Sequence, residues 1–366
     1  MIVLGITSAH LWRILAPALA AASFTFFSVV FVLYGKEPRV VDPGDYVREP
    51  VEGYTPALLA YLLRFGVVKP VDMVSTMIDL ARKGYAHIAE TRLPDGSYRH
   101  EIQLKEKEEA GLMPHELDVL KILKLVGAAD GISGEQLQEW ANLHALDVYR
   151  SYSEFRWDML TDGNARDFVT PRLSLITANI AVGGLVFLLA VGGLDVQGGG
   201  VGFKSSPGPM IAIALVALQL ALTPLLRRRT RKGAQDYLRW MAFKHFLRDF
   251  STVREWTPAA VVLWEEYLVY AIPLGLAHAV GQAIDMHAPP QLSNGFSWYG
   301  FEVEAGRSLG QSIGGLAGSF AEKAKDAFAT KPPRAEIAAA GLSPRAPSRA
   351  AVARGGVDAR AGRARG

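Results

Sequence analysis

The sequence contains no cysteine among its 366 residues, and its eight histidines are scattered along the chain. Without cysteine, a disulfide framework, a thiolate zinc or iron–sulfur site and a cysteine nucleophile are all excluded. No two histidines stand at the His-x-x-x-His spacing of a helical zinc site. The sequence therefore predicts no metal site, no cofactor and no catalytic residue, and we expect a protein that is not an enzyme.

Charged residues are missing from three long runs of the sequence. Ile14–Gly35, Leu173–Leu194 and Ser205–Leu226 each hold 22 residues without a formal charge. A helix needs roughly 20 apolar residues to cross a bilayer, and only a helix satisfies its own backbone groups in lipid. The runs predict three transmembrane helices, namely an anchor span in residues 1–35 and a helical hairpin of two spans in residues 173–226. The first run is too long for a signal peptide, so we expect a retained anchor.

The cations beside these runs indicate how the protein is oriented. Lysine and arginine collect in the cytoplasmic loops of membrane proteins. The loop Asp195–Lys204 carries one cation and one anion, whereas a basic cluster follows the third run directly: Arg227, Arg228, Arg229, Arg231 and Lys232. We therefore expect a multi-pass protein of the cell membrane with its N-terminus outside. Residues 36–172 and 227–366 are expected in the cytoplasm, with the basic cluster at the membrane surface.

Residues 36–172 read as a linker followed by a folded module. Proline and glycine interrupt residues 36–53, which predicts an extended linker. In residues 54–172, Thr55-Pro56 and Pro70 predict the starts of two helices. Alternating apolar residues on both sides of a Pro94-Asp95-Gly96 turn then predict two strands. Helix, helix, strand, turn and strand is the order of a winged-helix module, and two more helices are expected before residue 172.

The charge of residues 36–172 argues against a nucleic-acid partner. They contain 17 Lys and Arg but 23 Asp and Glu, a balance of −6. Binding to DNA depends on cations that displace phosphate counterions. The module is therefore expected to bind proteins, or a second copy of the chain, at the membrane surface.

Residues 227–285 predict further cytoplasmic or interfacial helices. A polar helix with an aromatic side is expected over Ala234–Phe250. The uncharged stretch 267–284 barely reaches the length of a fourth span, and Pro273, Gly275 and Gly281 interrupt it. A helix at or near the inner surface is therefore favoured over a span.

The C-terminal part changes composition twice. In residues 286–330, Gly306, Gly310, Gly314 and Gly318 recur every fourth residue, so they are either the small face of a packed helix or part of a flexible Gly-rich segment. We favour the flexible segment. Residues 331–366 are rich in Ala, Arg, Pro and Gly without periodicity, which predicts a disordered basic tail.

Two short motifs carry a resemblance to a known family. The first ends a predicted helix with Leu80-Ala81-Arg82-Lys83-Gly84-Tyr85, and we single out Gly84 and Tyr85. The second motif contains Trp264, Glu265, Tyr267, Leu268, Tyr270 and Ala271. In combination these motifs resemble the C-terminal membrane and cytoplasmic part of the YciQ-like predicted membrane proteins of bacteria. The resemblance implies no activity, because that family is a domain of unknown function.

The sequence leaves two functional hypotheses. The first is a non-catalytic, membrane-anchored scaffold or interaction protein whose partners are the lipid bilayer and another protein or a second copy. The second is an oligomeric transport component or channel, suggested by the Gly-rich outer loop and by Asn179 and Gln219 within the spans. The expected fold is a mainly α membrane protein with three transmembrane helices and a cytoplasmic helical, winged-helix-like α+β module.

Overall fold

The chain folds into two compact units in the computed structural model. The structure describes residues 2–170, 173–192, 196–197, 200–201, 207–249, 261–287, 296–300 and 308–340. The three-helix unit comprises residues 1–40 and 167–234, and the large unit comprises residues 41–166 and 235–366. The described part is mainly helical with a small mixed sheet, which confirms the predicted balance of secondary structure.

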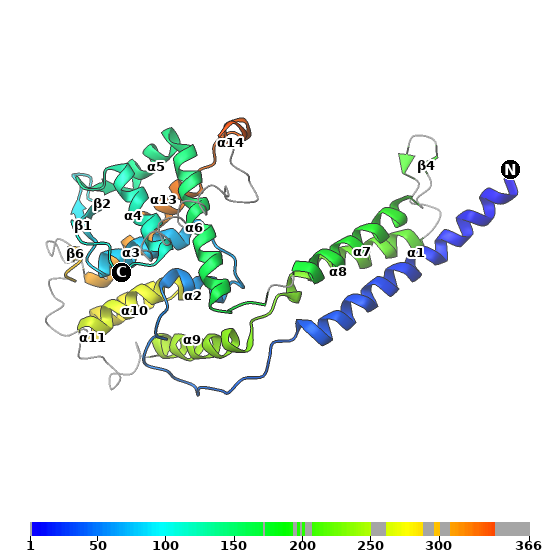
Figure 1. The fold of residues 1–366 in the computed structure, drawn as a ribbon, viewed down its shortest axis with the longest axis horizontal. Coiled ribbons are helices and arrows are strands. Elements are labelled where there is room, and N and C mark those ends of the chain that lie inside the picture. Colours follow the sequence, from blue (N-terminus) through cyan, green and yellow to red (C-terminus); the bar gives the residue numbers. More distant parts are fainter. Residues whose placement is uncertain are drawn as a thin grey trace, which may run out of the picture. The chain divides into compact units, whose positions relative to one another are not determined.

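Three helices form the first unit. They are α1 (Ile2–Val30), which continues as a π-helical turn (Phe31–Gly35), α7 (Leu173–Gly192), and α8 (Pro207–Leu222), which continues as a 3-10 turn (Thr223–Leu226). Figure 1 shows the helices packed side by side.

The buried positions of these helices alternate at spacings of four and three residues. This heptad spacing keeps one seam of each helix against its neighbours. The seam comprises Ala16, Ala20, Ser23, Phe27 and Val30 on α1, Asn179, Gly183 and Val186 on α7, and Ala212, Val216, Gln219, Thr223 and Leu226 on α8 and its 3-10 turn. The uniform apolar character of the three runs hides this repeat in the sequence.

The outward faces of the three helices are also apolar. Large hydrophobic side chains are exposed along all three, among them Phe26, Val29 and Leu33 on α1, Ile180, Leu185 and Leu188 on α7, and Ile211, Leu218 and Leu225 on α8 and its 3-10 turn. Polar side chains lie inside, at Ser23, Asn179, Gln219 and Thr223. Apolar side chains on the exterior, with these four polar side chains buried between the helices, are the reverse of the pattern in a water-soluble helical bundle.

One helix of the described part is long and apolar enough to cross a membrane. It covers Leu15–Gly35, 21 residues near the N-terminus. The apolar stretches of the other two helices, Leu175–Leu189 and Met210–Leu226, are shorter. The predicted hairpin of two spans is therefore not confirmed by helix length. Most of the predicted outer loop, Asp195–Lys204, lies outside the described residues, apart from the paired strands β4 (Val196–Gln197) and β5 (Gly200–Val201).

The large unit begins with the elements that the sequence predicts. Helix α2 (Pro56–Leu63) starts at the Thr55 N-cap, whose hydroxyl accepts a hydrogen bond from the Leu58 amide, and α3 (Pro70–Arg82) starts at Pro70. The strands β1 (Ala86–Arg92) and β2 (Tyr98–Leu104) form an antiparallel hairpin. Local capping and turn chemistry therefore suffices to place these elements.

Four more elements complete this part of the unit. They are α4 (Pro114–Val126), β3 (Ile132–Ser133), α5 (Gly134–Leu143) and α6 (Ala145–Ala165). The sheet has the order β3-β2-β1-β6, in which the distant strand β6 (Tyr299–Gly300) pairs in parallel with β1. A winged-helix topology is not confirmed, because β1 and β2 are the inner strands of a mixed four-stranded sheet.

The described part of residues 227–285 is mostly helical, as the sequence predicts. Helix α9 covers Arg231–Asp249. The stretch 267–284 is divided between α10 (Val261–Leu274) and α11 (Ala277–His287), which meet at Gly275 with a φ of +73°. These helices have 14 and 11 residues, fewer than the roughly 20 that a span needs. Since α10 packs on α2 and α3, the structure favours the prediction that this stretch is not a fourth span.

The described residues 308–340 are mostly helical, which differs from the flexible Gly-rich segment that we expected, while most of the predicted disordered tail lies outside the described residues. Residues 308–329 form α12 (Leu309–Gly315), a π-helical turn (Leu316–Phe320) and α13 (Ala321–Ala329). Helix α13 packs against α3, α5 and α6, and even the tail contains a short helix, α14 (Arg334–Ala339). Burial of an apolar side overrides the local composition here. Gly306 and residues 341–366 lie outside the described residues.

Of the three glycines of this series that the structure describes, Gly310 is the one whose small size has a visible reason. A Cβ atom at Gly310 would collide with the carbonyl oxygen of Gly281 on α11 and with the Asp285 carboxylate, whereas nothing lies within 4 Å of a Cβ at Gly318. The backbones of α11 and α12 therefore touch at Gly281 and Gly310.

Gly310→Ala should consequently destabilise the protein, and Gly318→Ala should not. Forcing a methyl group into a closed contact costs about 1–3 kcal/mol, whereas replacing an exposed helical glycine by alanine is neutral or stabilises by up to about 1 kcal/mol. Urea unfolding of the full chain in detergent, followed by tryptophan fluorescence, measures both variants. Equal unfolding midpoints for the two variants would contradict the packing of α11 on α12.

Candidate functional site

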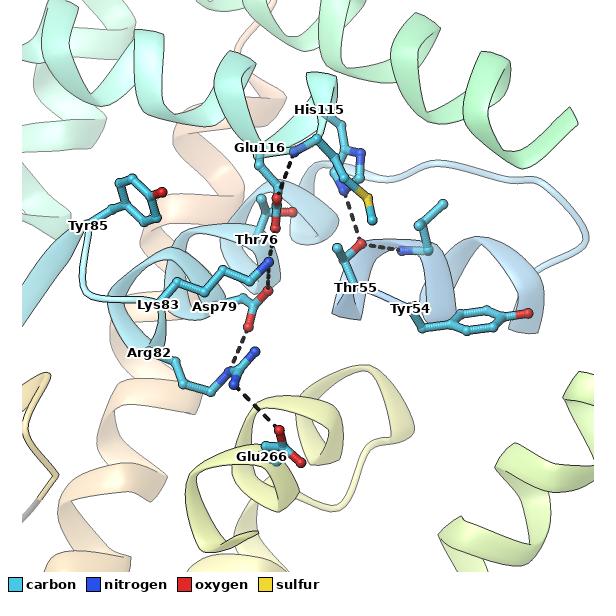
Figure 2. Close-up of polar contacts among 12 residues, drawn as sticks. Tyr54, Thr55, Thr76, Asp79, Arg82, Lys83, Tyr85, His115, Glu116 and Glu266 are labelled. Atoms are coloured by element: carbon cyan, nitrogen blue, oxygen red, sulfur yellow. Dashed lines mark hydrogen bonds and ion pairs between the residues drawn. The ribbon is translucent and has the colours of Figure 1, made fainter. Parts of the chain in front are cut away.

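The two motifs that carry the family resemblance meet in the large unit. The first lies at the end of α3 and the second lies on α10, and these helices pack together. Between the motifs, Arg82 Nη1 lies 3.8 Å from Glu266 Oε1 (Figure 2). The motifs are separated by about half the chain, so only the fold brings them to one place.

A chain of alternating charges extends from this contact into the interior (Figure 2). Asp79 accepts a hydrogen bond from Arg82 Nε at 2.8 Å, and its second oxygen lies 3.0 Å from Lys83 Nζ. Lys83 also pairs with Glu116, whose other oxygen accepts a hydrogen bond from the Met113 amide at 2.9 Å. The Asp79 and Glu116 side chains are only 2% and 1% exposed, so both carboxylates depend on these partners.

His115 lies beside this chain but does not take part in it. Its Nε2 atom lies 3.0 Å from the hydroxyl of Thr55, the N-cap of α2. Burial, together with the nearby Lys83 and Arg166 charges, lowers the pKa of His115 to about 3. His115 is therefore neutral at physiological pH, and its bond to Thr55 ties α4 to the start of α2.

Two tyrosines of the second motif hold the linker in place. The Tyr267 hydroxyl donates to the Arg48 carbonyl at 2.9 Å, and the Tyr270 hydroxyl donates to the Tyr54 carbonyl at 2.8 Å. Burial raises the pKa of Tyr267 to about 12 and raises the pKa of Tyr270. Both phenols consequently remain protonated donors at neutral pH.

The other motif residues are mostly buried. Trp264, Leu268 and Ala271 have at most 1% of their surface exposed. Tyr85 is 6% exposed and its hydroxyl donates to the Glu108 carbonyl, while Gly84 adopts a φ of +82° that ends α3. Burial raises the pKa of Glu265, and the Arg82 charge opposes that rise.

The geometry of this site suits holding helices together. Each charged group from Glu116 to Arg82 contacts an opposite charge or a backbone group. Helices α3 and α4 supply these groups, and α10 supplies Glu266, which pairs with Arg82. Within the described part of the chain, no group of three or more His, Asp or Glu side chains is placed to hold a metal ion.

The basic cluster after the third run divides into buried and exposed members. Arg229 is only 3% exposed, and its Nη1 atom lies 2.7 Å from Glu37 Oε1. Arg227, Arg231 and Lys232 are exposed, and Arg228 is half-buried. The five cations that the sequence groups together thus have different environments.

A connected set of hydrogen bonds lies inside the three-helix unit. The Gln219 amide donates to Asn179 Oδ1 at 2.8 Å, and the Asn179 amide donates to Thr223 Oγ1 at 2.7 Å. The Ser23 hydroxyl donates to Gln219 Oε1 at 2.8 Å. Sequence analysis emphasised Asn179 and Gln219 but missed Ser23, because the heptad repeat that places it on the seam is hidden in the uniformly apolar run. This network links all three helices.

A second buried cluster that sequence analysis missed joins the sheet to the C-terminal helices. Glu90 Oε1 accepts a hydrogen bond from the Ser312 hydroxyl at 2.8 Å, and Glu90 Oε2 lies 2.9 Å from His100 Nε2. The stretch Gly310-Gln311-Ser312-Ile313-Gly314 has the Gly-x-Ser-x-Gly spacing of a nucleophile elbow. This spacing is the sequence signal that could have drawn attention to Ser312.

The surroundings of Ser312 differ from those of a catalytic serine. Ser312 lies within α12 and not at a strand-to-helix turn, it is fully buried, and its hydroxyl donates to a carboxylate. A nucleophilic serine needs a histidine as its hydrogen-bond partner and an exposed position. Ser312 is therefore a cross-link between α12 and the sheet.

Asp118 is a buried carboxyl group between α4 and α6. It is 3% exposed, and Lys121 Nζ lies 3.1 Å from its Oδ1 atom. Burial raises the pKa of Asp118 to about 7, and the charges of Asp158 and Glu154 add to the rise against the effect of Lys121. Asp118 is thus partly protonated at neutral pH.

Asp118→Asn should change how stability depends on pH. The pKa of Asp118 is raised on folding, so wild type binds a proton more tightly when folded and loses stability as pH rises from about 4 to about 7. Since one pKa unit corresponds to about 1.4 kcal/mol, a rise of about three units means that the Asn variant should gain on the order of 4 kcal/mol relative to wild type over this range. Thermal unfolding of the full chain between acidic and mildly alkaline pH measures the difference.

The exposed Asp130 supplies the control for this experiment. Asp130→Asn should differ from wild type by the same small amount at every pH. A parallel pH profile for Asp118→Asn and wild type would contradict the raised pKa.

One comparison with known proteins gives a match. The model of the predicted membrane protein (DUF2207) C-terminal domain matches residues 43–284, about two thirds of the chain. No curated protein and no solved structure matches the chain. The match supports the resemblance at the level of the family and leaves the narrower YciQ-like group untested. Both motifs and the contact between them lie inside the matched range, and the chain belongs to the family of predicted membrane proteins that this domain defines.

Proposed function

We propose that the protein is a membrane-anchored interaction protein whose large unit binds another protein, or a second copy of the chain, at the inner membrane surface. In this proposal α1, α7 and α8 all cross the membrane, and the large unit lies in the cytoplasm. The observation that carries it is the three-helix unit, which has an apolar exterior and buries four hydrogen-bonded polar side chains between its helices.

The surface of the three-helix unit supports a bilayer environment for all three helices. Exposed Leu, Ile, Val and Phe side chains occur on α7 and α8 as well as on α1. Such side chains are favourable against lipid and unfavourable against water. The network of Ser23, Gln219, Asn179 and Thr223 satisfies its polar groups internally, as a lipid environment requires.

The charge distribution supports the proposed orientation. The cations Lys36, Arg39, Arg227, Arg231 and Lys232 follow the ends of α1 and of the 3-10 turn after α8, where the positive-inside rule predicts the cytoplasmic side. Both segments lead directly into the large unit.

The buried motifs support an interaction role over catalysis. The motif side chains build contacts among α2, α3, α10 and the linker, and their charges are paired internally. The large unit also exposes large apolar side chains, including Leu143 at 77% and Trp157 at 44%. We place partner binding on such exposed positions. The transport alternative has less support, because the Asn179 and Gln219 side chains are hydrogen-bonded to each other and to Thr223 and Ser23 within the unit.

Photo-crosslinking of the full chain in native membranes tests this proposal. A photoreactive amino acid at Leu143 or Trp157 should yield a defined crosslinked species, whereas the fully buried Leu59 is the control position. Mass spectrometry then identifies the partner or the second copy. Absence of any species above the Leu59 control would count against the interaction role.

Topology mapping tests the membrane arrangement separately. Reporter fusions after residues 45 and 240 should report the cytoplasm, and a fusion after residue 200 should report the outside. A cytoplasmic signal at residue 200 would contradict the two spans of α7 and α8.

A further inference from the structure

The three chain segments that join the two units are tied together at one end of the three-helix unit. The chain crosses between the units near residues 40, 166 and 234. We call residues 36–39, 167–170 and 227–234 the collar. Each of these segments adjoins one of the crossings and lies within the three-helix unit.

Backbone hydrogen bonds join two of the collar segments. The Thr170 amide donates to the Arg228 carbonyl at 3.1 Å, and the Thr230 amide donates to the Phe168 carbonyl at 3.2 Å. Gly233 lies so close to the Phe168 carbonyl that a Cβ atom there would collide with it. The segments 167–170 and 227–234 are therefore held in contact.

Two arginines attach the third collar segment, residues 36–39, to residues 227–234. Arg228 Nη1 donates to the Lys36 carbonyl at 3.2 Å, and Arg229 pairs with Glu37 at 2.7 Å. These contacts direct both guanidinium groups inward, toward the chain itself. Arg228 and Arg229 consequently build the collar.

The remaining cations of the collar do not take part in these contacts. Lys36, Arg39, Arg227, Arg231 and Lys232 are exposed. Among the described residues, none of these five side chains pairs with a carboxylate, and Lys232 lies 5.9 Å from the centre of the Phe168 ring. The exposed face of the collar therefore carries five cations.

We propose that this exposed face binds the headgroups of anionic phospholipids. It follows the ends of two apolar helical stretches at Gly35 and Leu226, where the proposed membrane arrangement places the boundary between the hydrocarbon layer and the lipid phosphates. Clusters of exposed Lys and Arg in this position attract anionic lipid. The inference rests on the proposed membrane arrangement and adds which cations contact lipid and which hold the collar together.

Lipid selection by the full chain tests the inference. The protein is reconstituted in an equimolar mixture of phosphatidylglycerol and phosphatidylcholine, and isolated with limiting styrene–maleic acid copolymer. The lipid that stays with wild type should be enriched severalfold in phosphatidylglycerol. The triple variant Arg227→Gln, Arg231→Gln and Lys232→Gln should return to the bulk ratio, and raised salt should weaken the wild-type enrichment.

Matched variants show whether lost enrichment comes from losing the headgroup contact or only from a change in net charge or in folding. Arg92→Gln, Lys105→Gln and Arg150→Gln remove three exposed cations of the large unit and should leave the enrichment unchanged. Arg227→Lys with Arg231→Lys keeps the charge and should also retain the enrichment. The inference is overturned if the triple collar variant selects lipid as wild type does, or if the large-unit variant loses selection equally.

The membrane arrangement itself has a separate readout. Wild type and the triple collar variant should both resist extraction with alkaline carbonate. If alkaline carbonate extracts wild type, the proposed membrane arrangement is wrong. If wild type stays in the membrane but does not select phosphatidylglycerol, only the headgroup inference is wrong.

Discussion

Lys83→Met is expected to lower the free energy of unfolding by about 3–5 kcal/mol, because it leaves the buried Glu116 without its cation and leaves Asp79 with Arg82 alone. Lys83 is the only side chain that pairs with both Asp79 and Glu116 in the described part of the chain. Those carboxylates are 2% and 1% exposed, so water does not replace the lost partner. Chemical denaturation of the full chain in detergent, followed by far-ultraviolet circular dichroism, measures the loss.

Lys124 supplies a matched control for this substitution. Lys124 pairs with Glu109, but the two side chains are 56% and 46% exposed. Exposed ion pairs contribute about 0–1 kcal/mol, so Lys124→Met should have little effect. Adding Glu116→Gln to Lys83→Met should restore part of the stability by removing one unpaired charge. Equal effects of Lys83→Met and Lys124→Met would refute the role assigned to the buried charge chain.

Trp240→Ala is expected to have an effect of similar size through packing. Trp240 lies on α9 and is fully buried. Its ring centre lies 5.5 Å from Tyr54, 5.5 Å from Phe243 and 5.0 Å from Tyr270, so it joins the linker to α9 and α10. Truncation of a buried tryptophan to alanine costs about 3–5 kcal/mol, since it removes apolar contacts and leaves a cavity.

Trp157 supplies the control for the packing prediction. It lies on α6 and is 44% exposed, so Trp157→Ala should change the unfolding midpoint only slightly. Trp240→Phe should restore much of the loss, because a smaller aromatic ring fills part of the cavity. A midpoint for Trp240→Ala equal to that of Trp157→Ala would contradict the aromatic contact between α9 and α10.

Much of the large unit could be predicted because its elements carry local signals. Thr55-Pro56 and Pro70 begin helices where they were expected, and the Pro94-Asp95-Gly96 turn lies between β1 and β2. Caps and turns depend on residues within about four positions along the chain, so the sequence contains the whole signal. The parallel pairing of β6 with β1 has no such signal, because its partners lie more than 200 residues apart.

The candidate site could be predicted only in part. The motif residues Gly84, Tyr85 and Trp264–Ala271 stood out in the sequence, but their contact did not. The Tyr267 hydroxyl reaches the Arg48 carbonyl across 219 residues of chain, and Ser312 reaches Glu90 across 222. Sequence patterns also treated Arg227–Lys232 as one basic cluster, whereas the fold buries Arg229 against Glu37 and leaves Arg227, Arg231 and Lys232 exposed.

The sequence by itself determined the absence of cysteine chemistry, the three uncharged runs and the positions of the cations beside them. Each of these depends only on the identity and order of residues. Tertiary structure alone decided that the Gly-rich C-terminal residues pack as α12 and α13, and that the charges of α3 and α4 are paired in the interior. Burial is a property of contacts between distant segments, and the free energy of those contacts overrides what local composition favours.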